Sequence, residues 1–121
     1  MRIILCMPFR THINDMLMTL GFMDIRSRIL YNTGCMMYKV LNGMAPFYLN
    51  DLFHEISSVH SLNTRKSKAG NLYMPSFKTY YGKSTFQYKG CVTWNVISKD
   101  IRDAKSFMSF KRAFKKDLKL C

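Results

Sequence analysis

Residues 56–99 combine seven basic with seven aromatic side chains, and this combination is the one pattern in the chain that indicates a specific chemistry. No carboxylate lies in the 44 residues between Glu55 and Asp100. Proteins hold single-stranded nucleic acid with cations along its phosphates and with rings that stack on its bases. The stretch therefore predicts a nucleic-acid-binding surface. The alternative is that the rings form a small core and the lysines its solvated rim.

Patterns typical of catalysis are weak. Two-metal chemistry needs clustered carboxylates, whereas the seven in this chain are spread along it. Triads can be written from His12, His54 or His60 with the many serines, so they carry no weight. The His and Cys spacings lack a second metal-binding pair, and no glycine-rich phosphate loop is present. We expect no catalytic residue, no metal and no cofactor in this chain alone.

The charge of the chain favours a polyanionic partner. Nineteen Lys and Arg against seven Asp and Glu give a net charge of +12 over 121 residues. Residues 1–60 carry a net +1, whereas residues 61–121 carry a net +11. A charge of this size attracts nucleic acid, anionic membrane or acidic proteins. The basic half is where we expect the partner to bind.

Cysteine usage and the N-terminal sequence suggest a compartment. The four cysteines are scattered and resemble no disulfide framework of a secreted protein. The apolar run of residues 3–7 ends at Pro8 and is too short for a membrane span or a signal peptide. We expect an intracellular chain without a membrane span, in the nucleus or the cytoplasm.

The first half of the chain reads as helical. After an N-terminal extension over residues 1–11, the segment 12–56 is predicted to form a compact cluster of three helices. One extends from a Thr11 cap to about Leu20, and the next two span residues 25–42 and 46–56. Glycines at positions 21 and 43 stand where helices commonly end.

The second half of the chain predicts a loop, a β-hairpin and a helix rather than a helical cluster. Residues 57–71 are polar and basic, as in a loop. Within residues 72–105, aromatic and β-branched residues favour a small β-hairpin turning at Gly82-Lys83, while Cys91–Val96 fits either a strand or a helix. Residues 106–121 predict a basic amphipathic helix capped by Ser106. The whole is predicted to be one small α+β domain.

The C-terminal helix has an aromatic seam formed by Phe107, Phe110 and Phe114. Such a seam usually packs against the rest of a domain. A basic helix with an apolar face also binds anionic membrane surfaces, which leaves membrane-surface association as an alternative.

Six segments together form a recognisable sequence pattern. They are residues 20–29 (LGFMDIRSRI), 38–49 (YKVLNGMAPFYL), 63–65 with 72–75 (NTR, LYMP), 82–86 (GKSTF), 94–95 with 100–102 (WN, DIR) and 107–111 (FMSFK). In order and spacing, over His12–Leu120, they resemble the C-terminal region of LINE-type (non-LTR, jockey-like) retrotransposon reverse transcriptases. The chain departs from that pattern at Phe22, at Asp24, at residues 32–34, which interrupt a normally aliphatic helix, and at residues 96–98.

The resemblance implies a tail that follows the polymerase domain and lacks that domain's catalytic aspartates. Such a tail would help to hold template RNA or target DNA and would have the upstream polymerase domain as a partner. Trp94 is assigned to the core. The predicted nucleic-acid-binding residues are Arg65, Lys66, Lys68, Lys78, Lys83 and Lys89 for phosphates and Tyr73, Tyr80 and Tyr88 for bases. The alternative function is structural: a degenerate fragment that only packs against the polymerase thumb.

Overall fold

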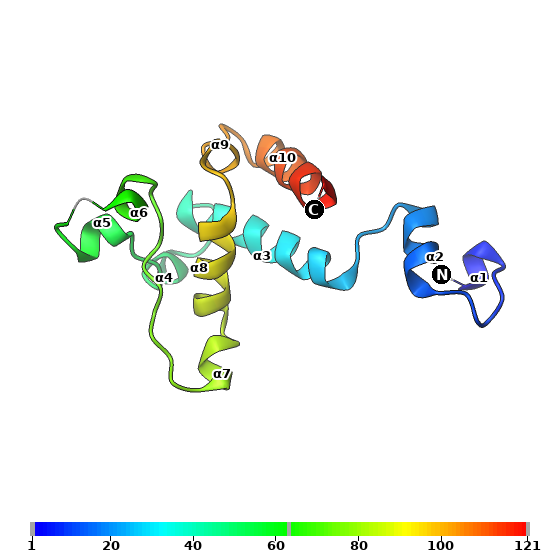
Figure 1. Cartoon of the computed structure of the whole chain (residues 1–121). Coiled ribbons are helices and arrows are strands. Elements are labelled where there is room, and N and C mark those ends of the chain that lie inside the picture. The colour runs from blue at the N-terminus through cyan, green and yellow to red at the C-terminus, as the bar shows by residue number, and fades with distance from the viewer. Residues whose placement is uncertain (1, 63, 121) are drawn as a thin grey trace.

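Three helices hold the chain together: α3 (Ile25–Leu41), α8 (Phe86–Val96) and α10 (Phe107–Leu120). The computed structural model describes residues 2–62 and 64–120. In it α8 crosses α3 on one side and α10 packs against α3 on another (Figure 1). The predicted extension and C-terminal helix begin and end at Met1 and Cys121, which lie outside the described residues.

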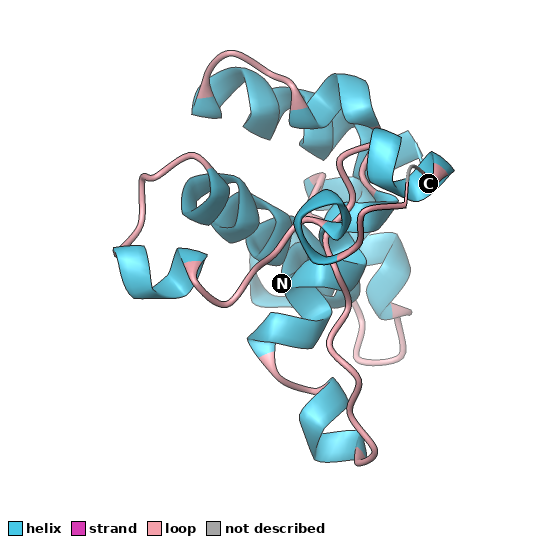
Figure 2. Ribbon diagram, turned by 90° about the vertical axis from the view of Figure 1, so that its left-hand side faces the viewer, coloured by secondary structure: helices cyan, strands magenta, loops and turns pink. Residues whose placement is uncertain are grey.

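The predicted α+β fold is wrong, because within these ranges the structure has ten helices and no β-sheet (Figure 2). Besides the three core helices there are seven short ones. These are α1 (Arg2–Leu5), α2 (Ile13–Leu20), α4 (Phe47–Asn50), α5 (Ile56–Val59), α6 (Arg65–Lys68), α7 (Tyr80–Lys83) and α9 (Lys99–Arg102). Two of them, α5 and α6, occupy the predicted loop.

The predicted β-hairpin is replaced by α7 and α8, and two threonines explain the difference. The Thr79 hydroxyl accepts a hydrogen bond from the Gly82 amide at 3.2 Å, and the Thr85 hydroxyl accepts one from the Tyr88 amide at 3.5 Å. Each threonine therefore caps a helix. Local capping outweighs the β-propensity of the neighbouring aromatic residues, and Cys91–Val96 continues α8.

The helical reading of the first half is confirmed for two helices and wrong for the third. Residues 13–20 and 25–41 are helical, with φ of 64° at Gly21 and 70° at Gly43 after them. The cap of α2 is His12 rather than Thr11. The predicted cluster of three helices over residues 12–56 is not compact: α4 packs against α3, but α2 lies beyond the N-terminal end of α3 (Figure 1).

The third predicted helix stops at Asn50 because the following backbone pairs with a distant segment. Tyr73 donates its amide to the carbonyl of His54 at 2.7 Å, and Ile56 donates its amide to the carbonyl of Asn71 at 3.0 Å. These bonds form an isolated antiparallel bridge between Glu55 and Leu72. Phe53, between the end of α4 and the bridge, is 6% exposed. Burial of its ring favours the extended path over a continued helix.

The core is a stack of aromatic rings shared by the three long helices. Phe110 of α10 is fully buried, with its ring 4.5 Å from that of Tyr38 and 6.1 Å from that of Trp94. The Tyr38 hydroxyl donates a 2.6 Å hydrogen bond to the Ala104 carbonyl before α10. The prediction that Trp94 belongs to the core is confirmed.

Asn95 and Arg102 attach the extended segment to this core. The Asn95 side chain accepts a hydrogen bond from the Leu72 amide at 2.8 Å and donates one to the Leu72 carbonyl at 3.0 Å. Nη1 of Arg102 donates to the Gly70 carbonyl and to the side chain of Asn71, both at 3.2 Å. Asn95, next to the core tryptophan, and Arg102 of α9 thus position residues 70–72.

A glycine lets α10 approach α3 closely. A Cβ placed at Gly34 would clash with the ring of Phe114, which is 3% exposed and held between Tyr31 and Phe110. The glycine that interrupts the aliphatic pattern of residues 32–34 is therefore a packing requirement.

We expect Gly34→Ala to lower the free energy of unfolding by about 1–2 kcal/mol. Overpacking costs roughly 1–3 kcal/mol, and the clash with a buried ring places this position in the upper part of that range. The better helix propensity of alanine returns about 1 kcal/mol. Urea unfolding followed by circular dichroism measures the change. Asn32→Ala, at an exposed position of the same helix, is the control and should be neutral or stabilising. A Gly34→Ala protein as stable as the control would contradict the close approach.

We expect Asn95→Ala to destabilise the chain by about 2 kcal/mol or more, because it leaves both backbone groups of Leu72 without their partner. The stability of Asn95→Asp should fall between those of the unmodified chain and Asn95→Ala. A carboxylate accepts the hydrogen bond from the Leu72 amide but cannot donate one to the Leu72 carbonyl. Asn50→Ala, at an exposed position, is the matched control in the same urea titration. Equal stability of Asn95→Ala and Asn50→Ala would show that the bridge is not held by this side chain.

Candidate nucleic-acid interface

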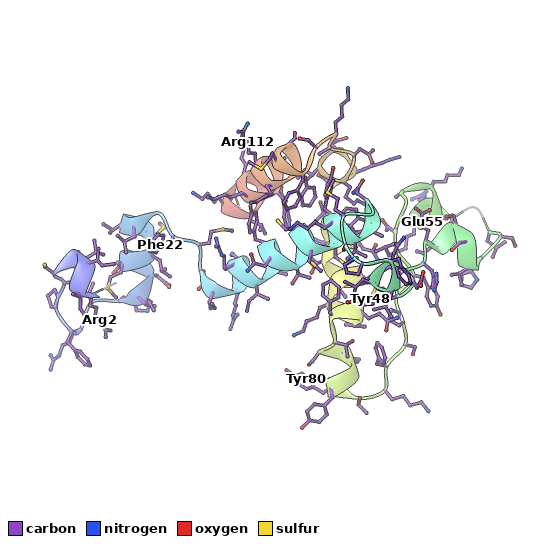
Figure 3. The ribbon with its side chains drawn as sticks, turned by 180° about the vertical axis from the view of Figure 1, so that it is seen from behind. Arg2, Phe22, Tyr48, Glu55, Tyr80 and Arg112 are labelled. Carbon is purple, nitrogen blue, oxygen red and sulfur yellow. The ribbon has the colours of Figure 1, made fainter. Side chains whose placement is uncertain are left out.

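Helix α7 lies away from the core and displays two tyrosines. We call residues 76–85 the α7 arm; it forms the lower end of the molecule in Figure 1. Tyr80 is 81% exposed and Tyr81 is 85% exposed. Figure 3 shows the Tyr80 side chain directed away from the rest of the chain. The two rings lie 6.4 Å apart at an interplanar angle of 74°, so each presents a separate face to solvent.

The arm is held by contacts behind the two tyrosines. The backbone at Gly82 lies against the half-buried Phe77, where an added Cβ would be 2.7 Å from the Phe77 Cβ. The ring of Phe77 meets the ring of Tyr88 edge-on at 6.3 Å, and Tyr88 belongs to α8. The arm is therefore attached to a core helix through its inner face.

Three exposed lysines surround this pair of rings in the sequence: Lys78 and Lys83 on the arm, and Lys89 in the second turn of α8. The carboxylate-free stretch of 44 residues includes all of them, so no acidic side chain of the same segment neutralises their charge. The arm thus offers both parts of the predicted chemistry, cations and free ring faces.

The nine predicted residues do not form one surface. Arg65, Lys66 and Lys68 are on α6, which Figure 1 places with α5 at one side of the core, apart from α7. Tyr73 belongs to this second group: it is 41% exposed and its ring meets that of His60 at 6.0 Å. Lys78, Tyr80, Lys83 and Lys89 lie on or next to the arm.

Two details of the predicted site change. Tyr88 is partly buried against Phe77, so it supports the arm rather than offering a free face. Tyr81 is as exposed as Tyr80 but was not predicted as a site residue. In a β-strand, successive residues point to opposite faces, and the hairpin interpretation therefore separated Tyr81 from Tyr80. The Thr79 cap was the signal that could have placed both rings on a short helix.

The C-terminal helix uses its aromatic seam for packing. Phe110 and Phe114 are buried, and Phe107 packs against the same core. The apolar face needed for insertion into a membrane surface is therefore occupied by α3. The outer face of α10 is basic; its exposed cations are Arg112, Lys115, Lys116 and Lys119.

Over residues 2–62 and 64–120, no three His, Cys, Asp or Glu side chains gather in a way that could hold a metal ion. None of the helices in these ranges is both long and apolar enough to cross a membrane. Comparisons with family models, curated proteins and solved structures found no match to this chain. The interpretation of the site therefore depends on its own geometry.

We expect tetranitromethane to nitrate Tyr80 and Tyr81 well before Tyr38, which is 2% exposed. Peptide mass spectrometry of a time course gives the order of modification. Tyr48, 59% exposed on a different helix, is the internal standard for an accessible ring. Rates for Tyr80 and Tyr81 as low as the rate for Tyr38 would contradict the outward-facing arm.

Proposed function

We propose that this chain is a non-catalytic nucleic-acid-binding segment and that its α7 arm contacts single-stranded RNA or DNA. The observation that carries the proposal is the exposure of Tyr80 and Tyr81 on a short helix flanked by lysines. Rings that face solvent so fully contribute little to the core. They are free to stack on bases, while Lys78 and Lys83 contact the adjoining phosphates.

The resemblance to LINE-type reverse transcriptases supports this proposal and supplies a context. Within such a protein the chain would be an intracellular tail that holds template RNA or target DNA beside the polymerase domain. The resembling positions Trp94, Asn95 and Arg102 serve the core and the attachment of residues 70–72. These three positions thus belong to the scaffold, whereas another resembling segment, residues 82–86, overlaps the arm to which binding is assigned.

A second candidate function is structural, and a specific surface favours it. Large apolar side chains are exposed on α2, on the following loop and on the first turns of α3: Ile13, Met18, Phe22, Ile25 and Ile29. A segment that packs against a polymerase domain would cover such side chains. In this case the chain binds no nucleic acid by itself.

We expect Tyr80→Ala with Tyr81→Ala to weaken binding of a labelled single-stranded RNA by at least about tenfold. Each lost stacking ring costs roughly 1–3 kcal/mol, and 1.4 kcal/mol corresponds to a factor of ten. Fluorescence anisotropy at two salt concentrations measures the affinity. Phe47→Ala, which removes an equally exposed ring from α4, is the control and should leave the affinity unchanged.

A lysine pair on the arm separates local contacts from total charge. Lys78→Gln with Lys83→Gln should weaken binding more than Lys115→Gln with Lys116→Gln, which changes the net charge equally on the outer face of α10. Equal losses of RNA affinity in both double variants would contradict the assignment of binding to the arm. Absence of RNA binding by the folded chain at low salt would favour the structural function instead.

A further inference from the structure

A basic cleft lies between α3 and α10. Helix α10 and the α7 arm lie on opposite sides of α3 (Figure 1). Its volume is about 320 Å³. The lining includes Arg28 and Lys39 of α3 and Lys111 of α10, together with the polar Asn32. No carboxylate is among the lining residues, so the cleft collects positive charge without local neutralisation.

The three cations occupy defined positions because each lies over an aromatic ring. Nζ of Lys39 is 4.9 Å and Nζ of Lys111 is 5.4 Å from the centre of the Phe107 ring. The guanidinium carbon of Arg28 is 6.0 Å from the centre of the Tyr31 ring. Cation–π contacts of this kind hold charged side chains in place without removing their charge.

The thiol of Cys35 lies in the wall of the same cleft as the three cations. Burial raises the pKa of this thiol, whereas a hydrogen bond with Tyr31 and the charges of the three cations lower it. The geometric observation is the shared lining: Cys35 and all three cations border one cleft.

The spacing of the cations defines the size of the ligand. Lys39 and Lys111 share one ring, so their ammonium groups form a pair. Arg28 is eleven residues from Lys39 along α3, which places their Cα atoms about 16 Å apart at 1.5 Å per residue. The cleft therefore follows about three turns of α3, and a chain of phosphates suits this length, with the lysine pair toward one end and Arg28 toward the other.

We propose that the α3–α10 cleft binds successive phosphates of a nucleic-acid backbone, as a contact separate from the α7 arm. The ligand class is the one in the proposed function, but the residues differ: Arg28, Lys39 and Lys111. The arm reads exposed bases by stacking, while the cleft holds the backbone by charge. A strand bound at both places would cross the three-helix core.

The test compares two double variants with equal net charge. Arg28→Gln with Lys111→Gln removes two cations from the cleft. Arg26→Gln with Arg112→Gln removes two exposed arginines nearby, and Figure 3 shows Arg112 directed away from α3. We expect the cleft variant to weaken single-stranded RNA binding roughly tenfold and to lower the salt slope by about 0.7 per lost contact, with a much smaller effect for the control.

Equal effects of the two double variants, or no effect of the cleft variant, would overturn the proposal. Loss of sedimentation with anionic phospholipid vesicles, without loss of RNA affinity, would also overturn it by assigning the phosphates to lipid headgroups. The arm variants are measured in the same RNA assay. A loss confined to them leaves the proposed function standing and refutes the cleft. A loss confined to the cleft variant supports the cleft and refutes the assignment of binding to the arm.

A measurement on the unmodified sequence is independent of folding defects in the variants. Saturating single-stranded RNA should slow alkylation of Cys35 by iodoacetamide several-fold, because the strand covers the cleft that this thiol lines. Cys6 is exposed in the loop after α1, and it serves as the reference whose rate stays constant. An unchanged Cys35 rate at saturating RNA would contradict a strand in the cleft.

Discussion

Phe110 is the point at which the three long helices meet, because its fully buried ring stacks on Tyr38 of α3 and lies beside Trp94 of α8. A small chain has little apolar area to bury, so one shared aromatic contact carries a large part of its cohesion. The hydrogen bond from Tyr38 to the Ala104 carbonyl holds the segment that precedes α10 against α3, and Ser106 caps the helix. This contact also holds α10 against α3, the two helices that line the basic cleft.

The polar contacts around the core serve the segments that have no regular structure. Asn95 takes the place of a neighbouring strand for Leu72, and Arg102 binds the backbone and side chain just before it. Buried backbone groups outside helices need such partners, because an unpaired amide or carbonyl costs free energy. Two neighbouring helices, α8 with Asn95 and α9 with Arg102, therefore order the connection between α6 and α7. Through Tyr88 and Phe77, α8 also holds the arm.

The sequence was informative where one periodicity or one cap determined the outcome. Apolar spacing together with Gly21, Gly43 and Ser106 predicted α2, α3 and α10 closely. It failed at residues 46–56, where long-range pairing with Leu72 ends the helix, since such pairing leaves no local signal. It also failed at residues 77–88, where β-propensity competed with two threonine caps. For the candidate site, the residue types predicted a surface of cations and aromatic rings. The sequence could not show that these residues divide between α6 and α7, or that Tyr81 lies beside Tyr80, because both depend on the fold.

The long sequence separation within the core has a consequence for synthesis. The partner of the Tyr38 hydroxyl lies 66 positions further along the chain. On a ribosome, α3 would emerge with Tyr38 uncovered, and its ring would stay so until Phe110 of α10 had also left the exit tunnel. Met37 would be covered earlier, by the backbone of α8 at Gly90. The order of translation thus leaves part of the core of the nascent chain open to solvent until α10 has been made.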